Sequence, residues 1–151
     1  MDIEHVHVDK QSPDAYKAFV GASVAVGKTA TDAGLERSLV ELVNVRVSQI
    51  NGCPTCLDVH HRKAAAAGVT EKQLTTVAVW RDTELFSERE QAALRLAEIT
   101  TTLPDHDTAE REYGRARKVL GDDELSAVIW VATAINAFNR VAILSRHLVK
   151  P

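Results

Sequence analysis

The chain has 151 residues, of which 45% are hydrophobic and 26% are charged, and this composition predicts a soluble globular protein with a single domain over residues 1–151. The net charge of −3 and the lack of a lysine and arginine cluster exclude the basic surface that a nucleic-acid partner needs. No basic and apolar leader opens the chain and no apolar run is long enough to span a membrane, so we expect a cytoplasmic protein without a membrane partner.

The first two predicted helices are recognised by their ends and by their polar faces. Ser12 as N-cap and Pro13 as the first helical residue predict a helix that runs to about Lys28. Residues 35–50 predict a second helix, because their apolar side chains take a wide arc opposite a narrow polar stripe. The stripe consists of Arg37, Glu41, Asn44 and Ser48. Asn51-Gly52 then ends the helix, since both residues tolerate positive φ.

Prolines, glycines and capping residues in the rest of the sequence also predict helices. Pro54 as first helical residue and Gly68 as terminator define a third helix. Thr70 caps a short helix to about Trp80, and the capping box of Ser87 to Glu90 opens one that runs to about Thr102. After a loop at Pro104, two more are predicted, over 108–121 and, with Asp122 as cap, over 124–148.

The last predicted helix is apolar nearly all round, so it lies centrally in the core or is shared with a partner subunit. We find no alternating strand pattern and no glycine-rich phosphate loop in the sequence. The expected fold is therefore all-α, a bundle of about six to seven helices with the CxxC motif at the N-terminus of one of them.

The two cysteines of the chain form the motif Cys53-Pro54-Thr55-Cys56, which is followed by His60. On a helix, the two thiols and the imidazole fall within about 60° of one another and share one face. The i, i+3 spacing brings the two Cβ atoms to about 5–6 Å, close enough for a disulfide. Two cysteines are too few for a secreted disulfide framework, which favours a catalytic or metal-binding role in a reducing cytoplasm.

Two different residues are candidates for the reactive thiolate. Cys53 at the N-cap would gain most from the positive end of the helix dipole. Cys56 lies one turn before His60, which could accept its proton and later protonate a leaving oxygen, so we weight Cys56 more heavily. Glu41 could fold back over the cysteines in a helical hairpin and orient His60; the alternative is a plain i, i+4 ion pair with Arg37.

The ordered set of Glu41, eleven residues, Cys53-Pro-Thr-Cys56, three residues and His60 resembles the core pattern of alkylhydroperoxidase D-like proteins in the carboxymuconolactone decarboxylase superfamily. The resemblance extends over nearly the whole chain as a single domain of this type. It includes the flanking segments 46–53, 64–68, 80–81, 86–90 and 134–140.

This resemblance implies a thiol-dependent peroxidase or disulfide oxidoreductase that reduces organic or hydrogen peroxides. It implies that Cys56 attacks the peroxide and becomes a sulfenic acid, that Cys53 condenses with it to a disulfide, and that Glu41 and His60 form a proton relay. No bound cofactor is implied. The implied electron donor is an external dithiol, in the best-known members a lipoyl-bearing protein, and the implied assembly is a homo-oligomer (dimer, trimer or hexamer). One departure is Thr55, where the best-known peroxidases carry a histidine.

Other interpretations of the motif remain open. Cys53, Cys56 and His60, with Glu41 or His61, could bind zinc, although structural zinc sites usually draw ligands from two separate segments. A non-catalytic interaction protein of the same fold is a further alternative. A decarboxylase acting on a lactone acid is another, and the CxxC motif argues against it because such members generally lack it.

Several polar residues outside the motif also lead to expectations. Buried polar groups need partners, so Asn136, Asn139 and Arg140 on the apolar last helix predict a structural network or a subunit contact. Arg46, on the apolar side of its helix, predicts a carboxylate partner at an interface. His5 and His7 are expected in a loose terminus, and His147 is expected to complement the dipole at the end of the last helix.

Overall fold

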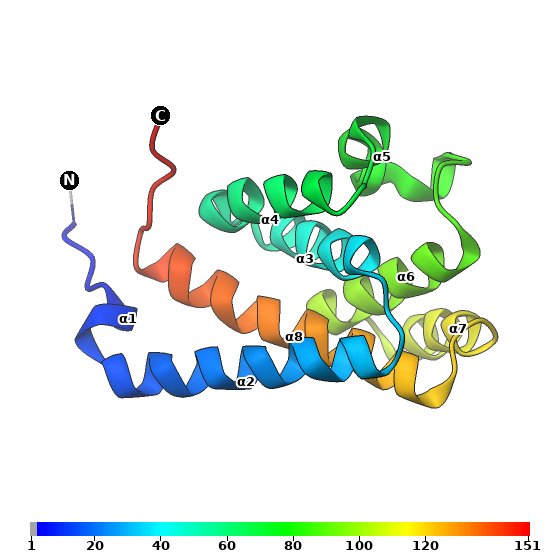
Figure 1. The fold of residues 1–151 in the computed structure, drawn as a ribbon, viewed down its shortest axis with the longest axis horizontal. Coiled ribbons are helices and arrows are strands. Elements are labelled where there is room, and N and C mark those ends of the chain that lie inside the picture. The colour runs from blue at the N-terminus through cyan, green and yellow to red at the C-terminus, as the bar shows by residue number, and fades with distance from the viewer. Residues whose placement is uncertain (1–2) are drawn as a thin grey trace.

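The computed structural model describes residues 3–151, and this part of the chain is helical throughout, with no strand (Figure 1). The expected all-α fold is confirmed, with eight α-helices and one 3₁₀ helix instead of six to seven helices. In chain order the elements are α1 (Val8–Gln11), α2 (Pro13–Asp32), α3 (Arg37–Asn51), α4 (Pro54–Ala66), α5 (Glu71–Thr76), the 3₁₀ helix η1 (Val77–Asp82), α6 (Glu88–Thr102), α7 (His106–Arg117) and α8 (Asp122–Leu144).

Helix α8 lies between α2 and the antiparallel hairpin formed by α3 and α4 (Figure 1). Helix α6 packs against both α3 and α8, and α7 covers α6 at the far end of the molecule. The main core lies between α3, α6 and α8, and a second apolar cluster joins α3 and α6 to η1 and the end of α4. The α3–α4 hairpin, which carries the CxxC motif, is thus supported by apolar contacts on two sides.

Helix α8 is the one described helix with the length and composition of a membrane span, at 23 residues and a mean hydropathy of 1.6. Its apolar side chains serve the core instead, where Val128, Ala132 and Ile135 are buried against α3 and α6. Only 33% of its most apolar stretch is buried, however. One face of the helix therefore remains uncovered in the isolated chain.

Most predicted helix starts are found in the structure, because they depend on short-range hydrogen bonds. Cys53 is the N-cap of α4, and Pro54 is its first residue. At α6, the Ser87 hydroxyl accepts a hydrogen bond from the Glu90 N–H (3.2 Å) and the Glu90 carboxylate accepts one from the Ser87 N–H (2.9 Å). Gly52, with φ of 67°, turns the chain between α3 and α4 as expected.

The predicted start of α7 at Thr108 and the predicted start and end of α8 are wrong. Helix α7 begins at His106 because the Asp105 carboxylate accepts the Thr108 N–H (3.0 Å) and so acts as N-cap. Helix α8 begins at Asp122 itself, after Gly121, whose N–H is bound by the Glu124 carboxylate (2.9 Å). It ends at Leu144, not at Leu148, and the chain turns away at Arg146 with φ of 53°.

Two other helix boundaries differ from the prediction. The helix expected between Thr70 and Trp80 is divided into α5 and η1 at Thr76, where φ is −110°, and η1 is itself kinked at Val79, where φ is −121°. Helix α2 continues one turn beyond Lys28, to Asp32. An ion pair between these two side chains (2.5 Å) supports that last turn.

The loose N-terminus expected around His5 and His7 is wrong for the described residues, because this segment is tied to the end of α8. His5 Nδ1 hydrogen-bonds to the Leu144 carbonyl (2.8 Å), and the Ser145 hydroxyl accepts the N–H of Val8 (3.0 Å). His147, expected to complement the helix dipole, instead pairs with Asp9 of α1 (3.0 Å) beyond the end of α8. The two ends of the described chain therefore meet at one end of the bundle.

Ion pairs and hydrogen bonds of charged side chains connect α3, η1, α6 and α7. Arg46 has the carboxylate partner that its position predicted, Glu98 of α6 in the same chain (3.0 Å). Glu98 also accepts hydrogen bonds from Trp80 (3.0 Å) and Arg81 (2.5 Å). This interface lies within the chain, so Arg46 needs no partner subunit.

Glu112 of α7 is buried in the same region and pairs with the guanidinium groups of Arg95 (2.5 Å), Arg81 (3.2 Å) and Arg115 (3.2 Å). Burial alone would raise the pKa of Glu112, but the hydrogen bonds and charges of Arg95 and Arg81 outweigh it and hold that pKa below 4.5. A lowered carboxyl pKa stabilises the fold above the ordinary value and loses that contribution as the pH falls through the lowered one.

We expect Glu112→Gln to lower the free energy of unfolding by about 2 kcal/mol near neutral pH, because it leaves arginine side chains without their buried counter-charge. Urea unfolding at about pH 7 and about pH 3 should show the difference from wild type shrinking at the lower pH. Glu110→Gln, at an exposed position of the same helix, is the control. A loss that is equal at both pH values would contradict the role of the ionised carboxylate.

Candidate active site

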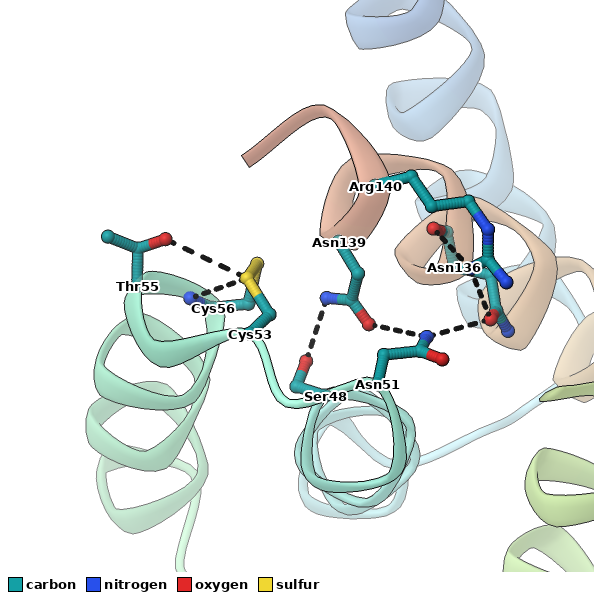
Figure 2. The surroundings of a disulfide bond; sticks show 8 residues. All are labelled: Ser48, Asn51, Cys53, Thr55, Cys56, Asn136, Asn139 and Arg140. Atoms are coloured by element: carbon teal, nitrogen blue, oxygen red, sulfur yellow. Dashed lines mark hydrogen bonds between the residues drawn. A yellow bond between two sulfur atoms is a disulfide. The ribbon is translucent and has the colours of Figure 1, made fainter. Parts of the chain in front are cut away.

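Cys53 and Cys56 form a disulfide across the first turn of α4, with their Cα atoms 5.3 Å apart (Figure 2). The Cys53 sulfur accepts hydrogen bonds from the Cys56 N–H (3.4 Å) and, since a disulfide sulfur carries no proton, from the Thr55 hydroxyl (3.7 Å). Cys53 is fully buried, whereas 9% of Cys56 is exposed. The oxidised pair thus fits the helix N-terminus without disturbing it, and Cys56 is the half that solvent reaches.

Glu41 lies on the face of α3 that is turned toward α4, as the polar stripe predicted, and its side chain is fully buried. Its Oε2 atom hydrogen-bonds to His60 Nδ1 (2.7 Å) and accepts a further bond from the Asn44 amide (3.3 Å). Its Oε1 atom forms an ion pair with Arg37 that lacks good hydrogen-bond geometry. Both interpretations of Glu41 are therefore found together: it pairs with Arg37 and it orients His60.

These contacts keep the Glu41 carboxylate ionised. Burial would raise its pKa, but the hydrogen bond and charge of His60, the Asn44 amide and the Arg37 charge together hold the pKa below 4.5. An anionic Glu41 accepts the proton of His60 Nδ1, so whenever the imidazole is neutral its free nitrogen is Nε2. The imidazole is thus oriented as a base whose Nε2 can serve a neighbouring group.

An open groove of about 460 Å³ lies between α2, α3, α4 and α8, and Cys56 and His60 both line it. Cys53 and Glu41 do not line the groove, since both are buried behind it. Cys56 and His60 are therefore both accessible to a small molecule in this groove. They are the site residues at the groove surface, and Cys53 and Glu41 support them from behind.

His61, the alternative imidazole for a metal, is exposed on α4, one residue past the groove-lining His60. Within residues 3–151 we find no group of three or more histidine, cysteine, aspartate and glutamate side chains arranged to hold a metal ion.

The polar residues of α8 that the sequence singled out form a network beside Cys53 (Figure 2). The buried Asn139 donates to the Ser48 hydroxyl (3.1 Å) and accepts from the Asn51 amide (3.0 Å), which also donates to Asn136 (2.9 Å). Arg140 binds the Asn136 side-chain oxygen in turn (3.0 Å). The structural network predicted from these residues is confirmed. Its hydrogen bonds connect the end of α3, just before Cys53, to α8.

We expect Asn139→Leu to lower the free energy of unfolding by about 2 kcal/mol, because the Ser48 hydroxyl and the Asn51 amide would lose a buried partner. Chemical denaturation measures this loss. Thr133→Val, at an exposed position on the same helix, is the control and should change stability by less than about 0.5 kcal/mol. Equal losses in the two variants would show that the network adds nothing to stability.

Sequence reasoning missed the contribution of α2 and α8 to the groove, because no short motif marks it. Lys63, two turns after Cys56, and Asn44, one turn after Glu41, also line the groove. The helical spacing of Cys56, His60 and Lys63 is a signal that could have placed the lysine on the same face of α4. The walls from α2 and α8 depend on tertiary packing alone.

Comparison with known proteins agrees with this architecture. The profile of the carboxymuconolactone decarboxylase family matches residues 13–98, which include all four predicted site residues. The uncharacterised protein YdfG of Bacillus subtilis (strain 168) is 31% identical over 116 residues, which make up 77% of this chain and 79% of YdfG. The alkyl hydroperoxide reductase AhpD of Bradyrhizobium diazoefficiens is 44% identical over 43 residues, covering 28% of this chain and 24% of that protein.

A crystal structure supports the same relationship over the full chain. A protein of unknown function from Agrobacterium tumefaciens, suggested to be the antioxidant defence protein AhpD, superposes with a TM-score of 0.85 at 28% identity, covering 98% of this chain and 100% of its own. The resemblance expected from the ordered motif is thereby confirmed. Since the family profile spans more than half of the chain and YdfG is similar over more than three quarters of it, the chain belongs to the carboxymuconolactone decarboxylase family.

Proposed function

We propose that the protein is a thiol-dependent peroxidase that reduces organic or hydrogen peroxides through its CxxC pair. The observation that carries this proposal is the arrangement of four groups. Cys56 and His60 line one groove, Cys53 lies within disulfide distance of Cys56, and a buried Glu41 holds His60 by its Nδ1 atom. A nucleophile, a base and a group that orients the base are the parts that covalent catalysis requires.

In the first step, His60 Nε2 accepts the Cys56 proton and the thiolate attacks the terminal peroxide oxygen, the one that carries the hydrogen. The O–O bond breaks, Cys56 becomes a sulfenic acid, and His60 returns the proton to the departing alkoxide or hydroxide. In the second step, the Cys53 thiol gives up its proton and its sulfur attacks the Cys56 sulfur. The S–O bond breaks, the leaving hydroxide takes up that proton and departs as water, and the disulfide forms. An external dithiol then supplies two electrons and two protons, reduces the disulfide and is itself oxidised to a disulfide.

Thr55 stands where the best-known peroxidases of the superfamily carry a histidine, so the relay here rests on His60 and Glu41. The Thr55 hydroxyl donates to the Cys53 sulfur. A hydroxyl donor at that point favours the departing thiolate of Cys53 when the disulfide is reduced. The relative named alkyl hydroperoxide reductase AhpD supports peroxide as the substrate class of this family branch.

We propose further that the protein acts in the cytoplasm, where dithiol donors such as a lipoyl-bearing protein are available, and that it forms a homo-oligomer. Within α2, only Ala30 is buried. The large apolar side chains of Phe19 on α2 and Trp130 on α8 are each 55% exposed. Covering such apolar side chains with a second copy would remove them from water. The mass of the intact protein by light scattering tests this assembly.

The test of the activity is consumption of hydrogen peroxide and cumene hydroperoxide with dihydrolipoamide as the reductant. We expect turnover that requires both the peroxide and the dithiol, with release of oxidised lipoamide. Absence of turnover with every peroxide and every dithiol would overturn the proposed function.

A further inference from the structure

The groove beside Cys56 is much larger than hydrogen peroxide requires. Its volume of about 460 Å³ lies within the range of sites that hold a drug-sized ligand. The Cys56 sulfur and the His60 imidazole occupy only part of its lining. The rest of the groove can contact a substituent that the peroxide carries.

The walls of this groove are mainly apolar and come from two helices outside the α3–α4 hairpin. Val20 and Val24 line it from α2, and Ile135 and Phe138 line it from α8. Tyr16 packs edge-on against Phe138, with ring centroids 6.3 Å apart. An extended hydrocarbon chain placed here would be removed from water along both sides, and each buried methylene group would strengthen its binding.

Cationic groups line the groove along the N-terminal part of α3 and the C-terminal part of α4. Lys63 lies seven residues after Cys56, so it shares the face of α4 that carries the sulfur, at about 10 Å along the helix axis. In residues 3–151 we find no carboxylate paired with Lys63, whereas Arg62 on the same helix pairs with Asp58 (2.9 Å). Arg37, the second cation, shares the single Glu41 carboxylate with His60.

The charged side chains that line the groove are therefore not all paired with an opposite charge. Among residues 3–151, Asp9 is the one carboxylate that lines the groove, and it is held by His147 (3.0 Å) instead of Lys63. Of the two groove-lining cations Arg37 and Lys63, Arg37 is paired with Glu41, so Lys63 is the one that a bound anion can pair with. An apolar channel with a spare cation about two helical turns from the reactive sulfur fits an amphipathic anion.

We propose that the preferred substrate is an organic hydroperoxide whose apolar chain carries a carboxylate, as in a fatty-acid hydroperoxide. The hydroperoxide would meet Cys56 and His60, the chain would lie between α2 and α8, and the carboxylate would pair with Lys63. This inference rests on the proposed peroxidase function and adds the source of its specificity. Hydrogen peroxide can use neither the walls nor the cation.

The experiment compares linoleic acid hydroperoxide with its methyl ester, which differs only in the lost charge. We expect wild type to have a kcat/KM about fivefold higher for the acid, as a partly exposed ion pair can provide. Lys63→Gln should bring this ratio close to one. Lys72→Gln, at an exposed lysine of α5 outside the groove, is the matched control and should keep the wild-type ratio.

A second pair of variants tests the wall without removing a cation. Val24 is 70% exposed, so Val24→Asp and Val24→Asn should both fold. Both substitutions should lower kcat/KM for linoleic acid hydroperoxide, because a polar wall binds its hydrocarbon chain less well. Only Val24→Asp should also lower the ratio of kcat/KM for the acid to kcat/KM for the ester, because the aspartate repels the carboxylate of the substrate. An equal ratio in the two variants would contradict passage of an anion along this wall.

The outcomes separate this inference from the function on which it rests. If hydrogen peroxide is consumed with a dithiol but wild type treats acid and ester alike, the peroxidase stands and the substrate class is wrong. An acid-to-ester preference that survives in Lys63→Gln would also overturn it. If no peroxide is consumed, calorimetric titration of wild type with decanoate and methyl decanoate decides the ligand class: equal binding or no binding overturns it, and tighter binding of decanoate supports it.

Discussion

Cys56→Ser is expected to abolish peroxide turnover, whereas Cys53→Ser is expected to consume about one equivalent of peroxide per chain and then stop. The difference follows from the roles proposed for the two sulfurs. Without Cys56 no thiol that lines the groove remains to attack, because Cys53 is fully buried behind it. Without Cys53 the attack still occurs, but the sulfenic acid on Cys56 has no resolving thiol.

Stopped-flow peroxide consumption and mass spectrometry of the intact chain measure both expectations. The steady-state rate of Cys56→Ser should fall by more than about a thousandfold, as expected when a nucleophile is lost. In Cys53→Ser the mass should increase by one oxygen after a single addition of peroxide. Each variant is the control for the other, since both remove the same disulfide and each changes one sulfur to oxygen.

The opposite result would reassign the nucleophile. Consumption of one equivalent by Cys56→Ser, with none by Cys53→Ser, would identify Cys53 as the attacking thiol, favoured by its position at the N-cap of α4. Turnover at the wild-type rate in Cys56→Ser would show that the CxxC pair is not the site of peroxide reduction.

Glu41→Gln is expected to lower kcat/KM for peroxide by about a hundredfold, the usual contribution of a positioned acid–base pair. The amide keeps the size of the side chain but removes the charge that fixes the proton on His60 Nδ1. His60→Gln should have an effect of similar size. Because the two residues act as one unit, the double variant should be no slower than the slower single variant.

Peroxide kinetics on the two single variants and the double variant check this expectation. Glu36→Gln is the matched control, since its carboxylate is exposed at the N-cap of the same helix. Urea unfolding of each variant separates lost catalysis from lost folding. Losses that multiply in the double variant would mean that Glu41 and His60 contribute independently, which would contradict a relay.

The sequence by itself determined the features that depend on neighbouring residues along one helix. Ser87 and Glu90 predicted the start of α6, and Pro54 predicted the start of α4, because caps and first-turn prolines act within a few residues. The common face of Cys56 and His60 follows from helical geometry alone. For Glu41, on the preceding helix, the sequence left an ion pair with Arg37 and a contact with His60 both open, and only the packed hairpin shows that both are formed.

Rules based on neighbouring residues failed where two residues could each cap the same helix, and where segments distant in the sequence come into contact. Asp105 and Thr108 could each cap α7, and only the packed chain shows that the Asp105 carboxylate binds the Thr108 N–H. His147 pairs with Asp9 from the opposite end of the sequence. No spacing rule links residues so far apart, since the order of helices around a core depends on side-chain packing.

Tertiary structure alone decided the surroundings of the reactive pair. The i, i+3 spacing made a disulfide possible, but the complete burial of Cys53 and the 9% exposure of Cys56 are set by the packed chain. In it, Asn139 of α8 binds Ser48 on the helix before the motif. The groove exists because α2 and α8 stand beside α4 and leave its walls apolar. The sequence therefore determined which groups can react, and the packing of distant helices decided which of them a substrate can reach.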